Sequence, residues 1–196
     1  MLLLPKIKRV HLLELISQHL KIDEHIEHFF REETETKTYS KGEILTHQNS
    51  YSQKVFFMEK GLARVFYYEN GKDITTNFYP EGRVFGNIDT IFTQKPTQYN
   101  IETLEESTIT FCNYEKLNQL CEVSLPAANF SRYLLGNLMT QLITRLASLQ
   151  HTTARERYAQ LLSENPDIIL RAPLGMVASY LGISQETLSR IRGKEI

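Results

Sequence analysis

Hydrophobic positions follow three different spacings along the 196 residues of the chain. From about Val10 to Phe30 they recur every three or four residues, which is typical of one or two short helices. Between Tyr39 and Tyr114, short runs rich in Val, Ile, Phe, Tyr and Thr alternate with turns that contain glycine, which is typical of antiparallel strands. From about Pro126 the helical spacing returns and continues. The pattern predicts an α+β fold in which a β unit precedes a helical part.

The dipeptide Asn70-Gly71 lies between two of the strand-like runs, YYE and KDITT. A type I′ turn needs positive φ at both of its central residues, and asparagine and glycine tolerate this conformation best. We therefore predict a two-residue hairpin here. Several hairpins at this spacing favour a sandwich or jelly roll.

A leucine stripe runs through the first part of the helical region. A helix of about 25 residues would be about 37 Å long at a rise of about 1.5 Å per residue, which is longer than the β unit needs for its own cover. The stripe either packs wholly on the β unit or forms the seam of a two-helix dimer, and we favour the dimer seam. The predicted seam residues are Leu135, Leu138, Leu142, Leu146 and Leu149.

The stretch MVASYLGISQETLSRIRGK, which ends at Lys194, has the spacing of two short helices that cross at a steep angle. Ala178 provides the small side chain needed where the helices meet, and Gly182 suits a turn with positive φ. Ser184 suits the N-cap of the second helix. An ordinary αα-hairpin is the alternative interpretation.

The second helix of this pair is polar and basic. Four basic residues and one acidic residue lie between Arg171 and Lys194, although the formal charge of the whole chain is −1. Arginine pairs with guanine, glutamate with the cytosine amino group and glutamine with adenine, and other polar side chains hold phosphates. The predicted DNA-binding residues are Ser184, Gln185, Glu186, Ser189, Arg190, Arg192 and Lys194.

The composition is that of an ordinary soluble globular protein, with 41% hydrophobic and 23% charged residues. Two cysteines, Cys112 and Cys121, provide no disulfide framework, which favours a reducing compartment. The apolar run in the leading MLLLPKIKRV is too short for a signal peptide, and no later apolar stretch is long enough to span a membrane. We therefore predict a cytoplasmic protein without a membrane partner.

The order of these parts resembles the Crp/Fnr family of bacterial transcription regulators. The resemblance runs from KGEILTHQ through the β unit and the long helix to LGISQETLSRIR, and so covers nearly the whole chain. It implies a β-roll of the cyclic nucleotide-binding type as a sensor in residues 1–125, a dimerisation helix in 126–152 and a helix-turn-helix DNA-binding domain in 153–196. It also implies a homodimer on a pseudo-palindromic operator in double-stranded DNA, with RNA polymerase as a further partner and no catalytic activity.

Two details depart from the family. Gln185, Glu186 and Arg190 take the places from which the family contacts bases, but the family usually has arginine where Gln185 stands, so we expect a different target sequence. Only IILRAP precedes the motif, and the chain ends almost at the second helix. We therefore expect the family's β-wing to be reduced or absent.

The effector segment departs further. Cyclic-nucleotide binders of the family read F-G-E-[LI]-A and then P-R-[ST]-A, where the glutamate holds the ribose and the arginine neutralises the phosphate. Here FGNIDTIFTQKPTQY has Asn87 for the glutamate and no arginine after Pro96. Burying a phosphate without a paired cation is costly, and the ammonium of Lys95 or a displaced Arg83 would be a poor substitute.

We therefore predict that the pocket is degenerate and does not bind cAMP or cGMP, which leaves an unknown small-molecule effector or none. The pocket residues are Phe85, Gly86, Asn87, Ile88, Thr97, Gln98 and Tyr99.

Other chemistries fit the sequence less well. An iron–sulfur cluster needs about four cysteines, and a cupin-type metalloenzyme needs several histidines where the β unit offers only His47. Haem would need an axial ligand, but lone histidines on polar faces are mostly solvated. A cyclic-nucleotide or other small-ligand receptor module without DNA binding is the nearer alternative, and the helix-turn-helix pattern argues against it. We predict no cofactor, no metal and no catalytic residue.

Overall fold

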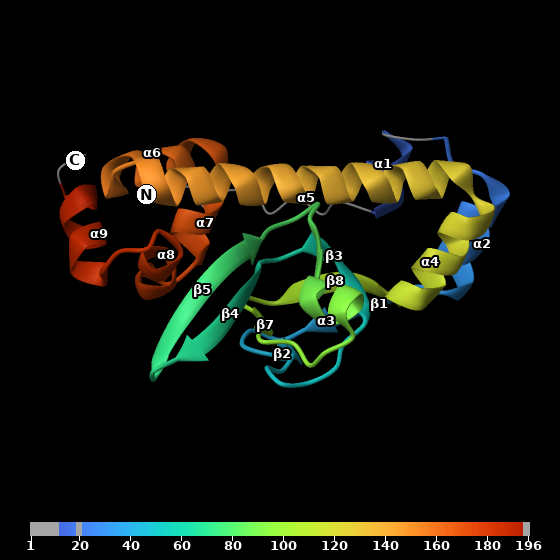
Figure 1. Ribbon diagram of the computed structural model, residues 1–196, viewed down its shortest axis with the longest axis horizontal. Coiled ribbons are helices and arrows are strands. Elements are labelled where there is room, and N and C mark those ends of the chain that lie inside the picture. Colours follow the sequence, from blue (N-terminus) through green and yellow to red (C-terminus); the bar gives the residue numbers. More distant parts are fainter. Residues whose placement is uncertain (1–11, 19–20, 194–196) are drawn as a thin grey trace.

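The computed structural model describes residues 12–18 and 21–193. Within this range the chain forms a β-roll of two four-stranded sheets, one long helix that runs along it, and groups of short helices at both ends (Figure 1). This agrees with the α+β arrangement that the sequence predicts.

The roll consists of antiparallel strands in two sheets that face each other. The first sheet has the order β1-β8-β3-β6 and the second β2-β7-β4-β5. Side chains from both sheets, among them Phe56, Phe85 and Ile101, are buried together between them. The strands are β1 (Glu35–Tyr39), β2 (Ile44–Thr46), β3 (Lys54–Lys60), β4 (Ala63–Glu69), β5 (Lys72–Tyr79), β6 (Val84–Gly86), β7 (Asn100–Thr103) and β8 (Ser107–Asn113).

The predicted hairpin is confirmed between β4 and β5. Glu69 pairs with Lys72, and the two residues between them have positive φ, 51° at Asn70 and 74° at Gly71. Both central residues of a type I′ turn need this conformation. The local sequence therefore fixes this turn.

The helices are α1 (Leu12–Ser17), α2 (Glu24–Glu32), α3 (Ile88–Thr93), α4 (Tyr114–Val123), α5 (Leu125–His151), α6 (Ala154–Glu164), α7 (Pro166–Arg171), α8 (Leu174–Tyr180) and α9 (Gln185–Arg192). The long helix α5 differs by one residue at each end from the range that the sequence predicts. Its N-cap is Ser124, whose side chain accepts the Ala127 N–H, and a proline lies in its first turn.

The segment IILRAP forms most of α7 and the cap that follows it, so it supplies no strand before α8. Among the described residues no strand lies C-terminal to Asn113. The expectation of a reduced or absent β-wing stays a prediction, as does the division of the chain into three functional parts.

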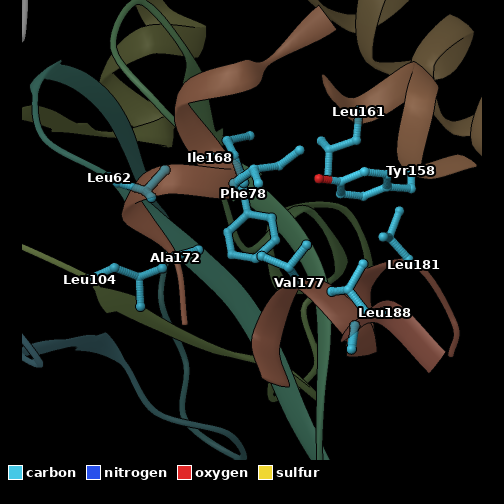
Figure 2. Close-up of a cluster of buried hydrophobic side chains, with 12 residues drawn as sticks. Leu62, Phe78, Leu104, Tyr158, Leu161, Ile168, Ala172, Val177, Leu181 and Leu188 are labelled. Carbon is cyan, nitrogen blue, oxygen red and sulfur yellow. The ribbon is translucent and has the colours of Figure 1, made fainter. Parts of the chain in front are cut away.

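One hydrophobic cluster joins the roll to the C-terminal helices. Leu62, Phe78 and Leu104 of the roll are buried together with residues of α6 to α9, including Val177 and Leu188. Figure 2 shows Phe78 lying between the roll and these helices, close to Val177. The helices α6 to α9 are therefore packed directly on the roll.

Candidate nucleic-acid interface and effector pocket

The turn between α8 and α9 has the geometry that the glycine predicts. Gly182 has a φ of 68°, its N–H donates to the Ser179 carbonyl, and the Ile183 N–H donates to the Ala178 carbonyl. This pair of hydrogen bonds is a Schellman motif, which ends a helix by using one residue in the left-handed conformation. Ala178 is almost fully buried, as expected for the contact between the two helices.

Helix α9 is anchored by one face and exposes the other. The Ser184 side chain accepts the Thr187 N–H and caps the helix, and Leu188 is fully buried in the cluster shared with the roll (Figure 2). The exposed residues include six of the seven predicted to bind DNA, namely Ser184, Gln185, Glu186, Ser189, Arg190 and Arg192. The seventh, Lys194, lies outside the described residues.

Charges on the exposed face of α9 are arranged along the helix. Glu186 lies in the first turn and Arg190 and Arg192 in the last. Hydrogen bonds with its own backbone N–H and with the Ser184 side chain lower the pKa of the Glu186 carboxyl. Glu186 is therefore a hydrogen-bond acceptor at neutral pH, while the Arg190 guanidinium donates to the Thr187 hydroxyl at 3.3 Å and otherwise faces solvent.

Arg171 does not belong to this basic surface, although it is one of the four basic residues in this part of the sequence. Its guanidinium is largely buried and donates to Glu81 at 2.8 and 2.9 Å and to Glu105 at 2.5 and 3.3 Å. Burial alone would lower the pKa of Arg171, but the hydrogen bonds and charges of the two carboxylates raise it overall. Arg171 therefore fastens α7 to the roll and contributes no free positive charge.

Helix α8 adds polar contacts to the same junction. The Ser179 hydroxyl accepts the Thr75 N–H at 3.0 Å and approaches the Asp73 carbonyl at 3.3 Å. The Tyr180 ring contacts the Phe78 ring and lies under the Arg145 guanidinium. The pair α8 and α9 is thus held against strand β5 and helix α5 together.

In the effector segment, the carboxylate of Asp89 accepts hydrogen bonds from two stretches of chain that lie beside each other. It accepts the backbone N–H groups of Thr90 at 2.9 Å and Gln98 at 3.0 Å, and the Thr97 hydroxyl at 3.0 and 3.1 Å. The same hydroxyl accepts from the Asn87 amide at 2.8 Å and from the Tyr99 N–H at 3.1 Å. An internal anion therefore occupies the centre of this segment.

The predicted pocket residues divide into those that join this network and those that do not. Asn87 and Thr97 are buried in it, and Tyr99 joins it through its backbone. Gln98 also joins it through its backbone N–H, although its side chain is exposed. Outside the network, Phe85 points into the core between the sheets, stacked between Phe56 and Tyr79, the Ile88 side chain is exposed and Gly86 has none. Lys95 and Arg83, the possible substitute cations, are both exposed.

Asp89 is not among the pocket residues that the sequence predicts, because that prediction rests on the positions where the family has glutamate and arginine. The signal was nevertheless visible in FGNIDT, because a carboxylate stands two residues after Asn87. Its partner Gln98 is nine residues away, so only the folded chain brings the two together.

Helix α5 exposes an apolar stripe between Leu135 and Leu149. Leu135, Leu142, Leu146 and Leu149 lie on it, each more than two-fifths exposed. Leu138, which the sequence assigned to the stripe, is half-buried against its own chain. Met139, with 59% of its surface exposed, takes the corresponding outward position.

Metal and redox chemistry have little support in the described residues. In residues 12–18 and 21–193 no group of three His, Cys, Asp or Glu side chains has a metal-binding arrangement. Both cysteines are free, and burial raises the pKa of the Cys112 thiol to about 12, which keeps it neutral and unreactive. In the same part of the chain no helix has the length and apolar character needed to cross a bilayer.

Comparison with known proteins gives matches at the level of one domain and of the fold. Residues 36–124 match the cyclic nucleotide-binding domain family. A search of curated protein sequences gave no match.

Solved structures resemble most of the chain at low sequence identity. FixK2 from Bradyrhizobium japonicum superposes with a TM-score of 0.73 at 18% identity, over 82% of this chain and 83% of its own. A CooA mutant from Carboxydothermus hydrogenoformans gives 0.70 at 22% identity, over 96% and 85%. A transcriptional regulator described as of the Crp/Fnr family, from Eubacterium rectale, gives 0.68 at 16% identity, over 87% and 82%.

These identities support a shared fold, and the matched domain covers the roll. Residues 36–124 are therefore similar to the cyclic nucleotide-binding domain, and the chain shares its overall fold with the Crp/Fnr regulators, which confirms the resemblance read from its sequence.

Proposed function

We propose that the protein is a homodimeric, sequence-specific DNA-binding regulator of transcription, and not an enzyme. The observation that carries this proposal is the construction of α9. Its single buried leucine fixes the helix on the molecule, and its polar and basic side chains face solvent except for the half-buried Thr187. A helix with this division can enter a major groove, whereas an ordinary αα-hairpin has no need to expose so many hydrogen-bonding groups.

The side chains of α9 suit different parts of DNA. Arg190 has the two-pronged guanidinium that pairs with guanine, and Glu186, held ionised, can accept from the amino group of cytosine. Gln185 stands at the start of the helix and suits adenine. Arg192 suits a phosphate, which would fix the register without reading sequence.

The exposed stripe of α5 supports a dimer. Its members alternate in steps of three and four residues from Leu135 to Leu149, which is the spacing of a two-helix seam. A two-fold axis along this seam would present two copies of α9. The operator is then a pseudo-palindrome with half-sites about 34 Å apart, one turn of the double helix. A contact with RNA polymerase belongs to the same proposal.

The Asp89 network supports a sensor pocket that does not take cyclic nucleotides. The two backbone N–H groups and the hydroxyl that could hold a cyclic phosphate are already bound to a carboxylate. A second anion at this position would meet like charge without a compensating cation beside it, because the Lys95 and Arg83 side chains are exposed to solvent. We expect calorimetric titration with cAMP or cGMP to give no saturable heat.

The decisive experiment is selection of bound sequences from a random DNA pool, followed by binding measurements on single-base variants of the selected site. Arg190→Ala should lose about 1 to 3 kcal/mol of binding free energy and relax the preference at one base pair per half-site. Gln150→Ala, on the exposed end of α5, is the control and should bind like the unaltered protein.

The result that contradicts the proposal is equally clear. If no sequence is enriched, or if Arg190→Ala binds every variant as the unaltered protein does, α9 does not read DNA. The protein would then fit a ligand-receptor module whose C-terminal helices serve only as a cover for the roll.

A further inference from the structure

A cavity of about 90 Å³ is lined by strands of the first sheet and by helices, and no residue of the effector segment lines it. Helices α1 and α2 form one wall and strands β3 and β8 another, while α4 and the first turns of α5 close the rest. In Figure 1 these helices gather at the end of α5 opposite to α8 and α9. The cavity is therefore separate from both the Asp89 network and the proposed DNA-reading helix.

The wall of the cavity is almost entirely apolar. Leu12, Ile16, Phe30, Val55 and Leu117 contribute to it from four different elements. Its few polar groups are bonded elsewhere, since the Thr34 hydroxyl donates to the Phe30 carbonyl at 2.7 Å.

The Thr110 hydroxyl, also in the wall, bonds with Glu59 and Thr36. The buried polar side-chain atoms that lack a partner in the described chain are on Thr46, Asn87 and Thr90, none of which lines the cavity.

A cavity of this kind favours an apolar occupant over water. A buried water needs two to four polar partners, and an apolar cavity of about 150 Å³ in another protein stays dry and binds benzene. The present cavity is smaller and partly open to solvent, which suits an occupant no larger than one ring. Burial of such a molecule removes apolar surface from water on both sides of the contact.

The cavity also touches the helix that carries the proposed dimer seam. Ala127, Phe130, Ser131 and Leu134 of α5 line it, and they follow one another at the spacing i, i+3, i+4 and i+7. These four residues form the inward face of the first turns of α5. The outward stripe of the same helix begins at Leu135, so an occupant would press on the helix just where its exposed stripe begins.

We propose that this cavity is a binding site for a small apolar molecule of single-ring size, whose occupancy stabilises the first turns of α5. The proposal goes beyond the proposed function, because it assigns a ligand site outside the effector segment. Its test requires no DNA, so its failure and the failure of the DNA-binding proposal are distinguishable.

The test is an NMR titration of the full chain with benzene, monitored by backbone amide shifts. Saturable shifts confined to the residues that line the cavity would support the proposal, and shifts that never saturate or that spread over the exposed surface would overturn it. Ala127→Leu fills the cavity and should raise the dissociation constant for benzene about tenfold or more. Ala147→Leu makes the same change on the exposed side of α5 and should leave the constant unchanged.

A second variant keeps the test decisive if Ala127→Leu fails to fold. Val55→Thr keeps the shape of a wall residue on β3 but places a hydroxyl against the apolar occupant, which should also weaken benzene binding about tenfold. Hydrogen exchange then tests the effect on α5. Benzene should slow exchange of the amides of residues 130–134, and an unchanged rate would overturn the proposed stabilisation of this helix.

Discussion

Asp89 receives hydrogen bonds from residues on both sides of the chain reversal between α3 and β7. Two backbone N–H groups and one hydroxyl are directed at the same carboxylate, and the hydroxyl of Thr97 is itself fully buried. Hydrogen bonds to an ionised acceptor contribute more to stability than neutral ones. The segment that would enclose an effector anion is thus stabilised by an anion of the chain itself.

This arrangement makes the stability of the roll depend on Asp89. Asp89→Ala should lower the free energy of unfolding by about 2 kcal/mol, because it leaves two backbone N–H groups and a buried hydroxyl without their acceptor. Asp89→Asn keeps one acceptor oxygen, so its free energy of unfolding should lie between those of Asp89→Ala and the unaltered protein. Urea denaturation followed by circular dichroism measures the differences, and an Asp89→Ala protein as stable as the unaltered one would show that these bonds contribute nothing.

At this scale the sequence predicts local features well and long-range pairs poorly. The positive φ of Gly182 and the capping role of Ser184 follow from neighbouring residues, and both are confirmed. The bond between Asp89 and Gln98 depends on how the chain reverses, and the pairing of Arg171 with Glu81 spans 90 residues. A count of charges along the sequence could not reveal that Arg171 is neutralised in this way.

Helix α5 shows how far an element can be predicted from its period. The extent of the helix follows from the sequence, but the choice between Leu138 and Met139 does not, because both fit a stripe with steps of three and four residues. In the folded chain Leu138 is half-buried and Met139 is exposed, so the surroundings of the helix, and not its period, decide between them.

The exposed stripe of α5 leads to a prediction about assembly. Leu142→Arg should give monomers in sedimentation experiments at micromolar concentration, because a seam would have to bury an unpaired charge. Thr144→Arg adds the same charge to an exposed position on the polar side of the helix and should leave the dimer intact. The idea of a seam is wrong if the unaltered protein is already monomeric at this concentration.

Strand β1 and helix α7 were not predicted, each for an identifiable reason. The sequence of β1, ETKTY, has only one buried residue, and the strand exists because it pairs with β8 along its whole length. Helix α7 has six residues, too few to show a helical period, and begins at a proline that suits a first turn. An element that is stabilised mainly by a neighbouring element need not show a hydrophobic period in its own sequence, and so it is hard to predict.

Across the whole molecule, the contacts of Arg171 decide how α7 is held on the roll. Glu81, one of its two partners, also accepts the Gly61 N–H at 2.8 Å, so the ion pair is tied to the turn between β3 and β4. Because the guanidinium is largely buried, its loss would leave two carboxylates facing each other without a counter-charge.

Removal of this side chain should therefore destabilise the protein strongly. Arg171→Ala should lower the free energy of unfolding by about 3 to 5 kcal/mol, the range for breaking a buried ion pair from one side. Arg171→Lys keeps the charge but loses the two-pronged geometry and should cost less. Chemical denaturation of both variants gives the comparison, and equal stability of Arg171→Ala and the unaltered protein would refute a structural role for the pair.

The cluster that includes Leu62, Phe78 and Leu188 has a consequence for how the chain unfolds. Neither the roll nor the C-terminal helices can enclose these side chains without the other, so opening either part exposes apolar surface of both to water. The two parts are therefore expected to unfold together, and not independently of each other. A destabilising substitution in the core of the roll should weaken the packing of α9 even without contacting it. Conversely, a stably packed α9 raises the free energy needed to unfold the roll locally.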